Sequence, residues 1–481
     1  MISVLPSAAI AQVDTRAQHE AHIPELLLME SAGIQAFQLL ESYLAIGERI
    51  VVIAGGGNNG GDALVLSRYA YNAGFTDQQI LLLSTTLSEA TQVQKQILNT
   101  YPIEFITLEE AEEAIDAADW IIDGITGTGL SGPLRPSLHP LVTLINESEA
   151  KVLSIDIPSG IGDTIATGHP AVVADLLVTM GGEKIGCYHP KSRAFCGEIT
   201  VVNPTFPPNL LEEVPPVAHR IDRRAKLISM GEEAYKNTRG HLGIWGGSAA
   251  YSGALRLAGR AAFASRAGLV TVHCDSTIHP IVAVESPAMM VRENHQMPQR
   301  PYDALLIGPG WGAGREELLE ELLALKRPTV LDADGIRAYS KIGAPVHTEL
   351  ILTPHLGELK ALLDEEVEAA PLAFIEQIKN LARTLEATLV VKSSLVYIVS
   401  PAGVVWIVQG RNPSLGVAGS GDLLAGIIAS LLAQGNDALA SATEGVLLHQ
   451  WAAVAAHTRY GYYDAEQLVE QIGIAVREAE R

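Results

Sequence analysis

The stretch that most constrains the fold is residues 49–68, where an apolar β-branched run enters a glycine-rich loop and continues as an amphipathic helix. This pattern predicts a strand, a loop and a helix in succession. Glycines let the backbone approach a ligand closely, and the free amides at the start of a helix attract anions such as phosphate. Gly55, Gly57 and Gly60 also have the G-x-G-x-x-G spacing of dinucleotide-binding loops. The next predicted strand, residues 80–83, is followed by a serine and two threonines rather than the carboxylate that would hold a ribose, which argues against an ordinary bound NAD.

Composition narrows the class of protein further. The 481 residues suffice for two domains with sizeable cores, and the formal charge of −22 at pH 7 argues against non-specific binding to nucleic acid or to an anionic membrane. Cys187, Cys196 and Cys274 are odd in number and form no C-x-x-C motif, so neither a disulfide framework nor a zinc site is indicated. No basic leader opens the chain, and the most apolar later stretch, residues 423–433, is too short to span a bilayer. We therefore expect a soluble, cytoplasmic protein without a nucleic-acid or membrane partner.

The order of apolar runs predicts two α/β domains. A helix is expected at residues 24–44. Short apolar runs at residues 80–83, 120–122, 152–155 and 176–180 are expected strands separated by helical stretches, which is typical of a parallel sheet. Five prolines between residues 204 and 216 interrupt this pattern and mark the best boundary. A second series of strands and helices follows, with a hairpin expected around residues 401–403. We expect domains at residues 1–215 and 216–481.

Several polar residues of the first domain stand at or just beyond the ends of predicted strands. Because the carboxyl ends of parallel strands meet at one edge of a sheet, these side chains should converge on one crevice. Amide, carboxylate and hydroxyl oxygens are hard ligands that suit an alkali or alkaline-earth cation. A single aspartate at such a position can equally well cap the next helix or turn. The residues are Asn58, Asn59, Asp62, Asp123, Asp156 and Ser159.

Four motifs of the first domain resemble the NAD(P)H-hydrate epimerase family. They are Leu28-Met-Glu-Ser-Ala-Gly33, Asn58-Asn-Gly-Gly-Asp62, Asp123-Gly-Ile-Thr-Gly-Thr-Gly129 and Asp156-Ile-Pro-Ser-Gly160. The resemblance covers about the first 200 residues and implies a Rossmann-like, three-layer domain whose substrate is the hydrated dinucleotide itself.

The same resemblance implies roles for individual residues. Asp156 would be the acid/base residue at the carbon that is epimerised, and Asn59, Asp123 and Ser159 would surround a potassium ion. The phosphates and sugars of the substrate would be held by Asn58, Asn59, Gly60, Gly61, Asp62, Gly127, Thr128, Gly129, Leu130, Ser131, Gly132 and Pro133. The sequence departs from the family pattern at Ala63 and in residues 180–186, and we expect Lys184 in the second of these segments to be a solvated lysine.

The second domain carries Gly419-Ser-Gly-Asp422 between its last predicted strand and an apolar helix. Small residues at a helix start leave backbone amides free to form an anion hole. The adjacent Asp422 can accept a proton from a hydroxyl group, so the pair suits phosphoryl transfer to an alcohol. The alternative is a glycine-rich turn in which Asp422 only caps the helix.

This motif resembles the G-x-G-D signature of ribokinase-like enzymes. Further motifs, such as Asn237-Thr-Arg-Gly-His-Leu-Gly243 and Thr353-Pro-His-Leu-Gly-Glu358, look like the ADP/ATP-dependent NAD(P)H-hydrate dehydratase domain, and the resemblance runs from about residue 222 to the C-terminus. It implies a ribokinase-like α/β domain that phosphorylates the hydrate so that its hydroxyl group departs. Asp422 would be the base, ADP or ATP with Mg²⁺ the phosphoryl donor, and ADP the more expected of the two.

This resemblance also assigns contacts residue by residue. Ala254, Gly312, His355 and Asp422 would contact the hydrate, and Lys392, Ser393, Ser394, Leu395, Val396 and Gly421 would contact the nucleotide. His355 could instead cap a helix that begins near Gly357. Together the two resemblances indicate a bifunctional enzyme that repairs hydrated NADH and NADPH.

Two other functions remain open from the sequence. A ribokinase-like vitamin or sugar kinase would use Asp422 on a small alcohol, but the epimerase motifs argue against it. A binding protein that has lost its activity would account for Ala63 and for the unusual residues within 392–418.

We also expect a homo-oligomer, because the apolar helix at residues 24–44 has outward residues, although core packing explains that helix equally well.

Overall fold

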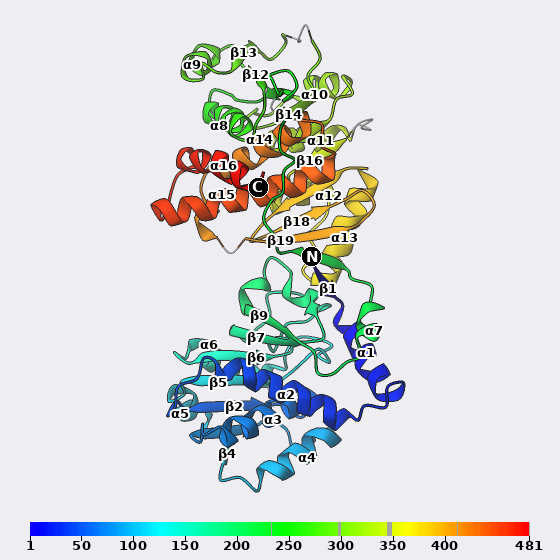
Figure 1. The fold of residues 1–481 in the computed structure, drawn as a ribbon, viewed down its shortest axis with the longest axis vertical. Coiled ribbons are helices and arrows are strands. Elements are labelled where there is room, and N and C mark those ends of the chain that lie inside the picture. Colours follow the sequence, from blue (N-terminus) through cyan, green and yellow to red (C-terminus); the bar gives the residue numbers. More distant parts are fainter. Residues whose placement is uncertain (232, 297–299, 344–348, 411, 481) are drawn as a thin grey trace. The chain divides into compact units, whose positions relative to one another are not determined.

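The structure is a computed structural model that describes residues 1–231, 233–296, 300–343, 349–410 and 412–480 (Figure 1). Arg411, within the unusual segment 392–418, lies outside the described residues. The chain divides into two compact units. The N-terminal unit comprises residues 2–219 and 368–375, and the C-terminal unit comprises residue 1 and residues 220–367 and 376–481.

The N-terminal unit is built on a parallel sheet with the order β4-β3-β2-β5-β6-β7-β9. Its strands are β2 (Ile50–Ala54), β3 (Gln78–Leu82), β4 (Glu104–Ile106), β5 (Trp120–Gly124), β6 (Lys151–Ile155), β7 (Ala174–Met180) and β9 (Cys196–Val202). Its main helices are α2 (Glu25–Glu41), α3 (Asn58–Asn72), α4 (Glu89–Leu98), α5 (Ala111–Asp116) and α6 (His139–Glu147), with short 3₁₀ turns η1 (Pro136–Leu138), η2 (Ile185–Cys187) and η3 (Arg193–Phe195).

Side-chain alternation along β2 explains why helices cover both faces of this sheet. Ile50 and Val52 pack with the apolar side chains of α2 and α3. Val51 and Ile53 point the other way and pack with those of α5 and α6. The three-layer α/β arrangement expected from the sequence is therefore confirmed for this unit (Figure 1).

The first residues of the chain form a smaller layer of the N-terminal unit. β1 (Ile2–Leu5) pairs in parallel with the two-residue strand β8 (Glu183–Lys184), with Leu5 opposite Lys184. α1 (Ser7–His19) follows at once and packs with α7 (Pro208–Glu212) and α2 through a small apolar cluster. Ser7 donates from its backbone N and its Oγ to the carboxylate of Asp163, at 2.6 and 2.8 Å.

The C-terminal unit contains a mixed sheet with the order β13-β12-β11-β14-β15-β16-β17-β18-β19. Neighbouring strands are parallel up to β17, and the hairpin β17-β18-β19 is antiparallel. The strands are β11 (His241–Trp245), β12 (Leu269–Cys274), β13 (Met290–Glu293), β14 (Ala304–Ile307), β15 (Thr329–Leu331), β16 (Leu350–Leu352), β17 (Thr388–Lys392), β18 (Leu395–Val399) and β19 (Val405–Gln409), and β10 (Ala218–Ile221) spans the point where the sequence passes between units.

Helices surround this sheet, and α14 lies in its main apolar core. They are α8 (Ser252–Ala264), α9 (His279–Glu285), α10 (Glu316–Leu323), α11 (Ala333–Ile342), α12 (Leu356–Leu363), α13 (Pro371–Thr384), α14 (Ser420–Ala433), α15 (Ala438–Tyr460), α16 (Ala465–Ala479) and the 3₁₀ turn η4 (Pro413–Leu415). The first residues of α13, up to residue 375, belong to the N-terminal unit. The hairpin β18–β19 confirms the one expected around residues 401–403. Within the described ranges, no helix has both the length and the apolar character needed to cross a bilayer.

Candidate functional site

The N-terminal unit has a cavity of about 610 Å³ at the carboxyl ends of β2, β5 and β6. Of the residues expected to bind there, Asn58, Asn59, Asp62 and Asp156 line it, together with Gly127, Thr128, Gly129 and Leu130. Ser131, Gly132 and Pro133 are not among the lining residues. The strand ends therefore converge on one crevice, as the parallel sheet requires.

Gly60 and Gly61 do not line the cavity but lie in the first turn of α3. A Cβ on Gly60 would be 2.1 Å from the backbone O of Gly55, and one on Gly61 would be 2.4 Å from Met29 Cε. These two glycines let the start of α3 pack against the loop and α2. They therefore affect ligand binding through the position of α3 and not by direct contact.

Asp156 directly follows β6 and has a left-handed backbone with φ of +70°. Its N–H donates to the backbone O of Val178 at 2.6 Å. Its Oδ1 accepts a hydrogen bond from Lys184 Nζ at 2.5 Å and one from the N–H of Met180 at 3.3 Å. An L-residue with a positive φ is strained, and such strain persists only where the surroundings fix it.

Lys184 is not the solvated lysine expected from the sequence. Its side chain is 0% exposed. Besides Asp156, its Nζ donates to Thr179 Oγ1 at 2.7 Å and to the backbone O of Met180 at 3.0 Å. The expectation was wrong because β8, which contains Lys184, pairs in parallel with β1. No local sequence pattern predicts that pairing.

Asn59, Asp123 and Ser159 are brought together next to this cavity. Ser159 donates from Oγ to Asp123 Oδ1 at 2.6 Å and from N to Oδ2 at 2.9 Å. Ser159 Oγ also accepts from the N–H of Thr126, whose carbonyl accepts from Asn59 Nδ2 at 3.0 Å. Asp123 is fully buried, and burial raises the pKa of its carboxyl although the hydrogen bonds from Ser159 and Ser154 oppose that rise.

Two oxygens of this cluster are left without a partner. Asn59 Oδ1 and Thr126 Oγ1 are buried and accept or donate no hydrogen bond. Buried unsatisfied oxygens are costly and often mark an ion or a water that completes the site. Among the described residues there is no group of three or more His, Cys, Asp or Glu suited to a metal, so the donor set here is one of amide, hydroxyl and single carboxylate oxygens. This set fits a potassium ion better than a transition metal.

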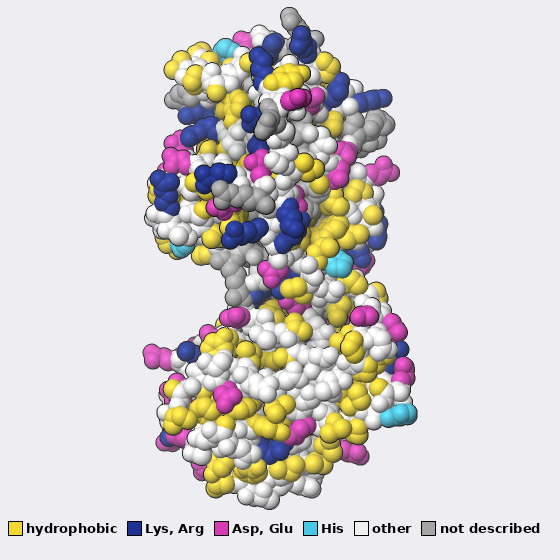
Figure 2. Space-filling view, in the orientation of Figure 1, with side chains coloured by type: hydrophobic (Ala, Val, Ile, Leu, Met, Phe, Trp, Pro, Cys, Tyr) yellow, Lys and Arg dark blue, Asp and Glu magenta, His cyan; other side chains and the backbone are white. Residues whose placement is uncertain are grey.

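Carboxylates dominate the charged lining of the cavity. Asp14 on α1 and Glu25 on α2 face it together with Asp62 and Asp156. Burial raises the pKa of Asp62 well above its usual value, and the charges of Asp156, Asp14 and Glu25 raise it further. On the face shown in Figure 2, Lys and Arg side chains are also few over this unit. Sequence reasoning missed Asp14 and Glu25, since they lie in a polar opening stretch and in a helix interpreted only as core.

Asn58 lines the cavity, and both ends of its side-chain amide form hydrogen bonds within the protein. Its Nδ2 donates to Glu25 Oε1 at 2.6 Å, and its Oδ1 accepts from Ser88 Oγ at 2.7 Å. These contacts join α3 to the starts of α2 and α4. A ligand that bonds to Asn58 would therefore displace or share an existing contact.

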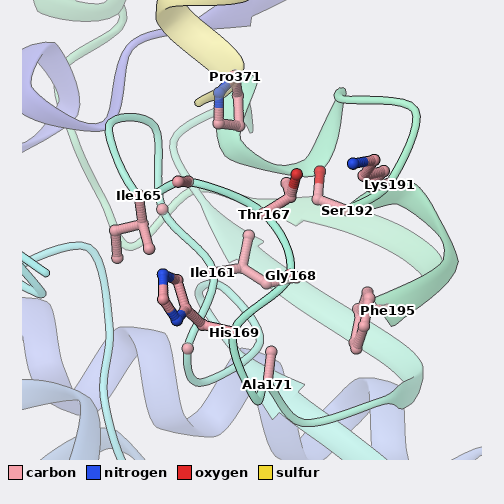
Figure 3. Close-up of a pocket in the computed structure, with 13 residues that line it drawn as sticks. Ile161, Ile165, Thr167, Gly168, His169, Ala171, Lys191, Ser192, Phe195 and Pro371 are labelled. Carbon is pink, nitrogen blue, oxygen red and sulfur yellow. The ribbon is translucent and has the colours of Figure 1, made fainter. Parts of the chain in front are cut away.

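A second cavity of the N-terminal unit is lined mainly by residues of the segments 160–171 and 191–195 (Figure 3). Figure 3 shows Ile161, Ile165 and Phe195 among its lining side chains. Its volume is about 20 Å³, which is room for a single water molecule. This cavity is too small for the substrate of an enzyme, so the larger crevice is the candidate site of this unit.

In the C-terminal unit, Asp422 lies in the first turn of α14, after Gly419 with φ of +91°. The pKa of Asp422 is raised from 3.8 to about 7, mainly by burial and in addition by the charges of Asp332 and Asp334. The charge of Lys392 opposes this rise. A carboxylate with a pKa near neutrality can both accept and release a proton.

Lys392 binds Asp332 rather than Asp422. Its Nζ donates to Asp332 Oδ1 at 2.7 Å, and Thr353 Oγ1 donates to the same oxygen at 2.6 Å. A Cβ on Gly421 would lie 3.5 Å from Lys392 Nζ, so the end of β17 and the start of α14 face each other. Lys392 and Gly421, both expected at the nucleotide, are thus adjacent.

The other residues expected at the nucleotide differ in what they can offer. Leu395 and Val396 open β18 and are 0% and 7% exposed, so neither side chain is open to a ligand. Ser393 Oγ donates to the backbone O of Leu395 at 2.5 Å and so closes the turn before β18. Ser394 stands between these residues in the same turn.

Of the residues expected at the hydrate, Gly312 contacts Asp334 and Ala254 lies beside Gly310. The N–H of Gly312 donates to Asp334 Oδ2 at 2.8 Å. A Cβ on the neighbouring Gly310 would be 3.0 Å from Ala254 Cβ. Asp332 and Asp334 are thus two further carboxylates of this site, which accept from Lys392 and Thr353 and from Gly312, respectively.

His355 caps α12. Its Nδ1 accepts from the N–H groups of Gly357 and Glu358 at 3.0 and 3.2 Å, and Glu358 in turn accepts from the N–H of His355. This reciprocal pair is a capping box. The capping alternative is therefore present in the structure, and the side chain of His355 is still 53% exposed.

Sequence reasoning also missed His449. This histidine of α15 lies with its Nε2 3.2 Å from Ser420 Oγ, at the first residue of α14. Burial lowers the pKa of His449 to about 4, so the ring is neutral at physiological pH and supports the helix start through a hydrogen bond. Its position in the sequence of α15 gave no signal of this contact.

Comparison with known proteins gives matches for both units. Residues 25–186 match the family described as YjeF-related protein N-terminus, and residues 242–473 match the family described as NAD(P)H-hydrate dehydratase. The chain is 32% identical to the bifunctional NAD(P)H-hydrate repair enzyme Nnr of Coxiella burnetii, over 90% of this chain and 91% of that one. It is also 32% identical to the enzyme of the same name from Archaeoglobus fulgidus, over 94% of each.

Among solved structures, a crystal structure of the ADP/ATP-dependent NAD(P)H-hydrate dehydratase from Bacillus subtilis with ATP and Mg²⁺ is 25% identical. The match covers 53% of this chain and 95% of that one, with a TM-score of 0.49.

Proposed function

The chain belongs to the family of bifunctional NAD(P)H-hydrate repair enzymes, and we propose that it catalyses both reactions that this name covers. It epimerises the R and S hydrates of NADH and NADPH, and it dehydrates the S hydrate at the expense of ADP or ATP. The first reaction belongs to residues 1–215 and the second to residues 216–481. The observation that carries this division is that each unit places one aspartate, Asp156 or Asp422, beside other residues of the matched motifs.

The chemistry of the N-terminal unit requires proton transfer at one carbon. Inverting C6 of the hydrated ring means breaking and remaking one bond at this carbon while the proton of its hydroxyl group is taken up and returned, and a fixed carboxylate can pass that proton in both directions. Asp156 lines the cavity and is rigidly held, which suits this role. Asn58, Asn59, Asp62 and the loop from Gly127 to Pro133 would hold the rest of the dinucleotide, with the start of α3 facing its phosphates.

A potassium ion would complete the oxygen cluster of this unit. Asn59, Asp123 and Ser159 would hold it, and the buried, unpartnered Asn59 Oδ1 supports that assignment. The ion would supply positive charge next to an otherwise acidic cavity. Replacing K⁺ by choline should lower the epimerase rate and leave the dehydratase rate unchanged, and equal rates of epimerisation in the two salts would contradict the site.

The chemistry of the C-terminal unit begins with phosphorylation of the hydrate. Hydroxide is a poor leaving group, whereas a phosphorylated hydroxyl group departs easily and restores the conjugated ring. Asp422 would accept the proton of that hydroxyl group, and the amides at the start of α14 would face the phosphate. Ala254, Gly312 and His355 would contact the hydrate.

The nucleotide would bind beside Gly421. Lys392, Ser393, Ser394, Leu395 and Val396 would contact it, with Mg²⁺ bound through its phosphates. The short approach between Gly421 and Lys392 supports this assignment. We propose ADP as the first donor to test, with ATP as the comparison.

Two further proposals concern the oligomeric state and the cellular location of the protein. A homo-oligomer would cover Leu26 and Leu27 of α2, which are 38% and 58% exposed. A cytoplasmic location fits the three unpaired, buried cysteines, since reducing compartments keep thiols free.

One pair of variants tests the division of labour. With hydrated NADH and ADP, recovery of reduced-nicotinamide absorbance should be complete for the wild type and should stop after the S epimer for Asp156→Asn. Asp422→Asn should recover nothing, yet it should still interconvert the epimers when these are separated by chromatography. Loss of proton transfer costs about 10²–10⁴-fold in rate. Near-normal interconversion by Asp156→Asn, or recovery by Asp422→Asn, would remove the corresponding assignment.

A further inference from the structure

Lys184 uses all of its hydrogen-bonding capacity inside the protein. An ammonium group has three donors, and those of Lys184 go to Asp156 Oδ1, Thr179 Oγ1 and the backbone O of Met180, at 2.5, 2.7 and 3.0 Å. Its side chain is 0% exposed. A lysine bound in this way has no donor left for a substrate, so any part it takes in the reaction acts through Asp156.

The two oxygens of Asp156 have different surroundings. Oδ1 accepts from Lys184 Nζ and from the N–H of Met180. Oδ2 accepts no hydrogen bond from any residue that the structure describes, and the Asp156 side chain is 14% exposed to the cavity. The fixed oxygen is thus on the protein side, and the oxygen with open lone pairs is on the side of the substrate.

The backbone strengthens this asymmetry. The left-handed φ of Asp156 and its hydrogen bond to Val178 set the direction of the Cα–Cβ bond, so the ion pair has only the side-chain torsions left to fix. Once Oδ1 is bound to Lys184, rotation of the carboxylate would break a charge-assisted hydrogen bond in a buried place.

We propose that Lys184 is a positioning residue of the epimerase reaction, which fixes Asp156 Oδ1 and so leaves Oδ2 as the atom that exchanges a proton with the hydrate. The proposal rests on the epimerase function proposed for this unit. In the reaction, Oδ2 receives the proton of the C6 hydroxyl group as the C6–N1 bond opens and its electron pair moves to N1. When N1 closes on the other face of C6, Oδ2 returns the proton to the oxygen, and the ion pair at Oδ1 stays intact throughout. Displacement of a catalytic group by about 1 Å costs roughly 10²-fold, which sets the expected effect.

The test compares Lys184→Met with Lys191→Met. Both variants remove one positive charge, but Lys191 is exposed and lies seven residues further along the chain. Lys184→Met should lower the kcat of epimerisation by about 10²-fold with KM changed less than about threefold. Lys191→Met should behave as the wild type. Dehydration of the pure S hydrate by the same preparations checks that the enzyme is intact.

The pH profile separates positioning from a loss of folding. The other charged groups that face Asp156 are Asp14 of α1, Glu25 of α2 and Asp62 of α3, all of them acidic. Because Lys184 is the cation among them, its removal should move the acid limb of the kcat profile to higher pH by about one unit. A destabilised site would lose activity without such a shift, and Lys184→Arg, which keeps the charge, should keep the limb in place.

The outcomes distinguish this proposal from the one on which it rests. If Lys184→Met keeps its kcat within about threefold, or loses activity through KM with an unmoved acid limb, the positioning role is wrong. If Asp156→Asn itself keeps epimerase activity, the proposed function of the site fails first. If Asp156→Asn has lost epimerase activity but Lys184→Met is fully active, only the positioning role is wrong.

Discussion

The two units each hold one aspartate at the candidate site, but the nearby lysine is used differently. In the N-terminal unit, Lys184 binds Asp156 directly. In the C-terminal unit, Lys392 binds Asp332, and no described residue forms an ion pair with Asp422. An ion pair fixes a carboxylate in place, whereas burial without one raises its pKa, as Asp422 shows with a value of about 7. The N-terminal unit therefore fixes the orientation of its aspartate, whereas the C-terminal unit raises the proton affinity of its aspartate.

The largest expected effect on stability concerns Lys392, which pairs with Asp332 and not with Asp422. Lys392→Met leaves the carboxylate of Asp332, only 3% exposed, without its cation. Breaking a buried pair in this way should lower the free energy of unfolding of the C-terminal unit by about 3–5 kcal/mol, measured by urea denaturation. Lys360→Met, whose lysine pairs with Glu366 on the surface, should cost less than about 1 kcal/mol. Equal losses in the two variants would mean that the Lys392 pair is not structural.

A second prediction is that the same substitution has opposite effects on stability in the two units. Asp156→Asn removes the anion that faces the buried Lys184 and should lower the free energy of unfolding by about 2–4 kcal/mol. Asp422→Asn removes a carboxylate that burial disfavours, and at about pH 8 it should raise that free energy by roughly 1–3 kcal/mol, after allowance for partial exposure.

The sign of the second effect follows from the pKa of Asp422, which folding raises from 3.8 to about 7. The folded state holds this proton more tightly than the unfolded state does, so its contribution to stability is complete below about pH 4 and is lost as the pH rises through about 7. The gain from Asp422→Asn should therefore vanish near pH 4. Thermal unfolding at the two pH values measures it, and a gain that persists in acid would contradict the assignment.

A third prediction concerns the rate of dehydration. If Asp422 accepts the proton, the initial rate with pure S hydrate should fall about tenfold for each pH unit below about 7. Lys392 lowers the pKa of Asp422, so the Lys392→Met variant should show the same fall beginning at a higher pH. A flat profile from about pH 5.5 to 8 in the wild type would show that another group is the base.

The smallest expected change in stability is at the glycine beside Asp422. A Cβ on Gly421 would meet only Lys392 Nζ, at an ordinary contact distance of 3.5 Å, so Gly421→Ala should change the free energy of unfolding by less than about 0.5 kcal/mol. It should nevertheless raise the KM for ADP about tenfold, because the methyl group occupies the approach to the helix amides. Gly253→Ala, in open space on α8, is the matched control and should change neither quantity. An unchanged KM for Gly421→Ala would place the phosphates elsewhere.

The parts of the fold that the sequence predicted are those with a local cause. Apolar runs became strands within one or two residues, and aspartates at strand ends gathered in one crevice because parallel strands end together. The start of α14 was also predicted, since small residues followed by an apolar helix are a local signal.

The parts that could not be predicted depend on contacts between distant segments. Lys184 was expected in solvent because residues 180–186 depart from the family pattern. Its burial accompanies the pairing of β8 with β1, in which Val4 lies opposite Glu183, 179 residues further along the chain. Asp14 reaches the cavity only because α1 packs on α2 and α7. The choice of Lys392 between Asp332 and Asp422 is likewise set by the sheet order and not by spacing along the chain.

The pairing of β1 with β8 has a consequence for how the N-terminal unit folds. The first strand is made before any of its partners, and it must wait until nearly the whole unit has been synthesised before Leu5 can lie opposite Lys184. Closing a loop of that length is among the slow steps of a folding reaction. The sheet of the unit can therefore assemble first, and the ion pair at Asp156 forms when the N-terminal strand docks. A refolding experiment should accordingly show epimerase activity returning later than the far-ultraviolet signal of the sheet.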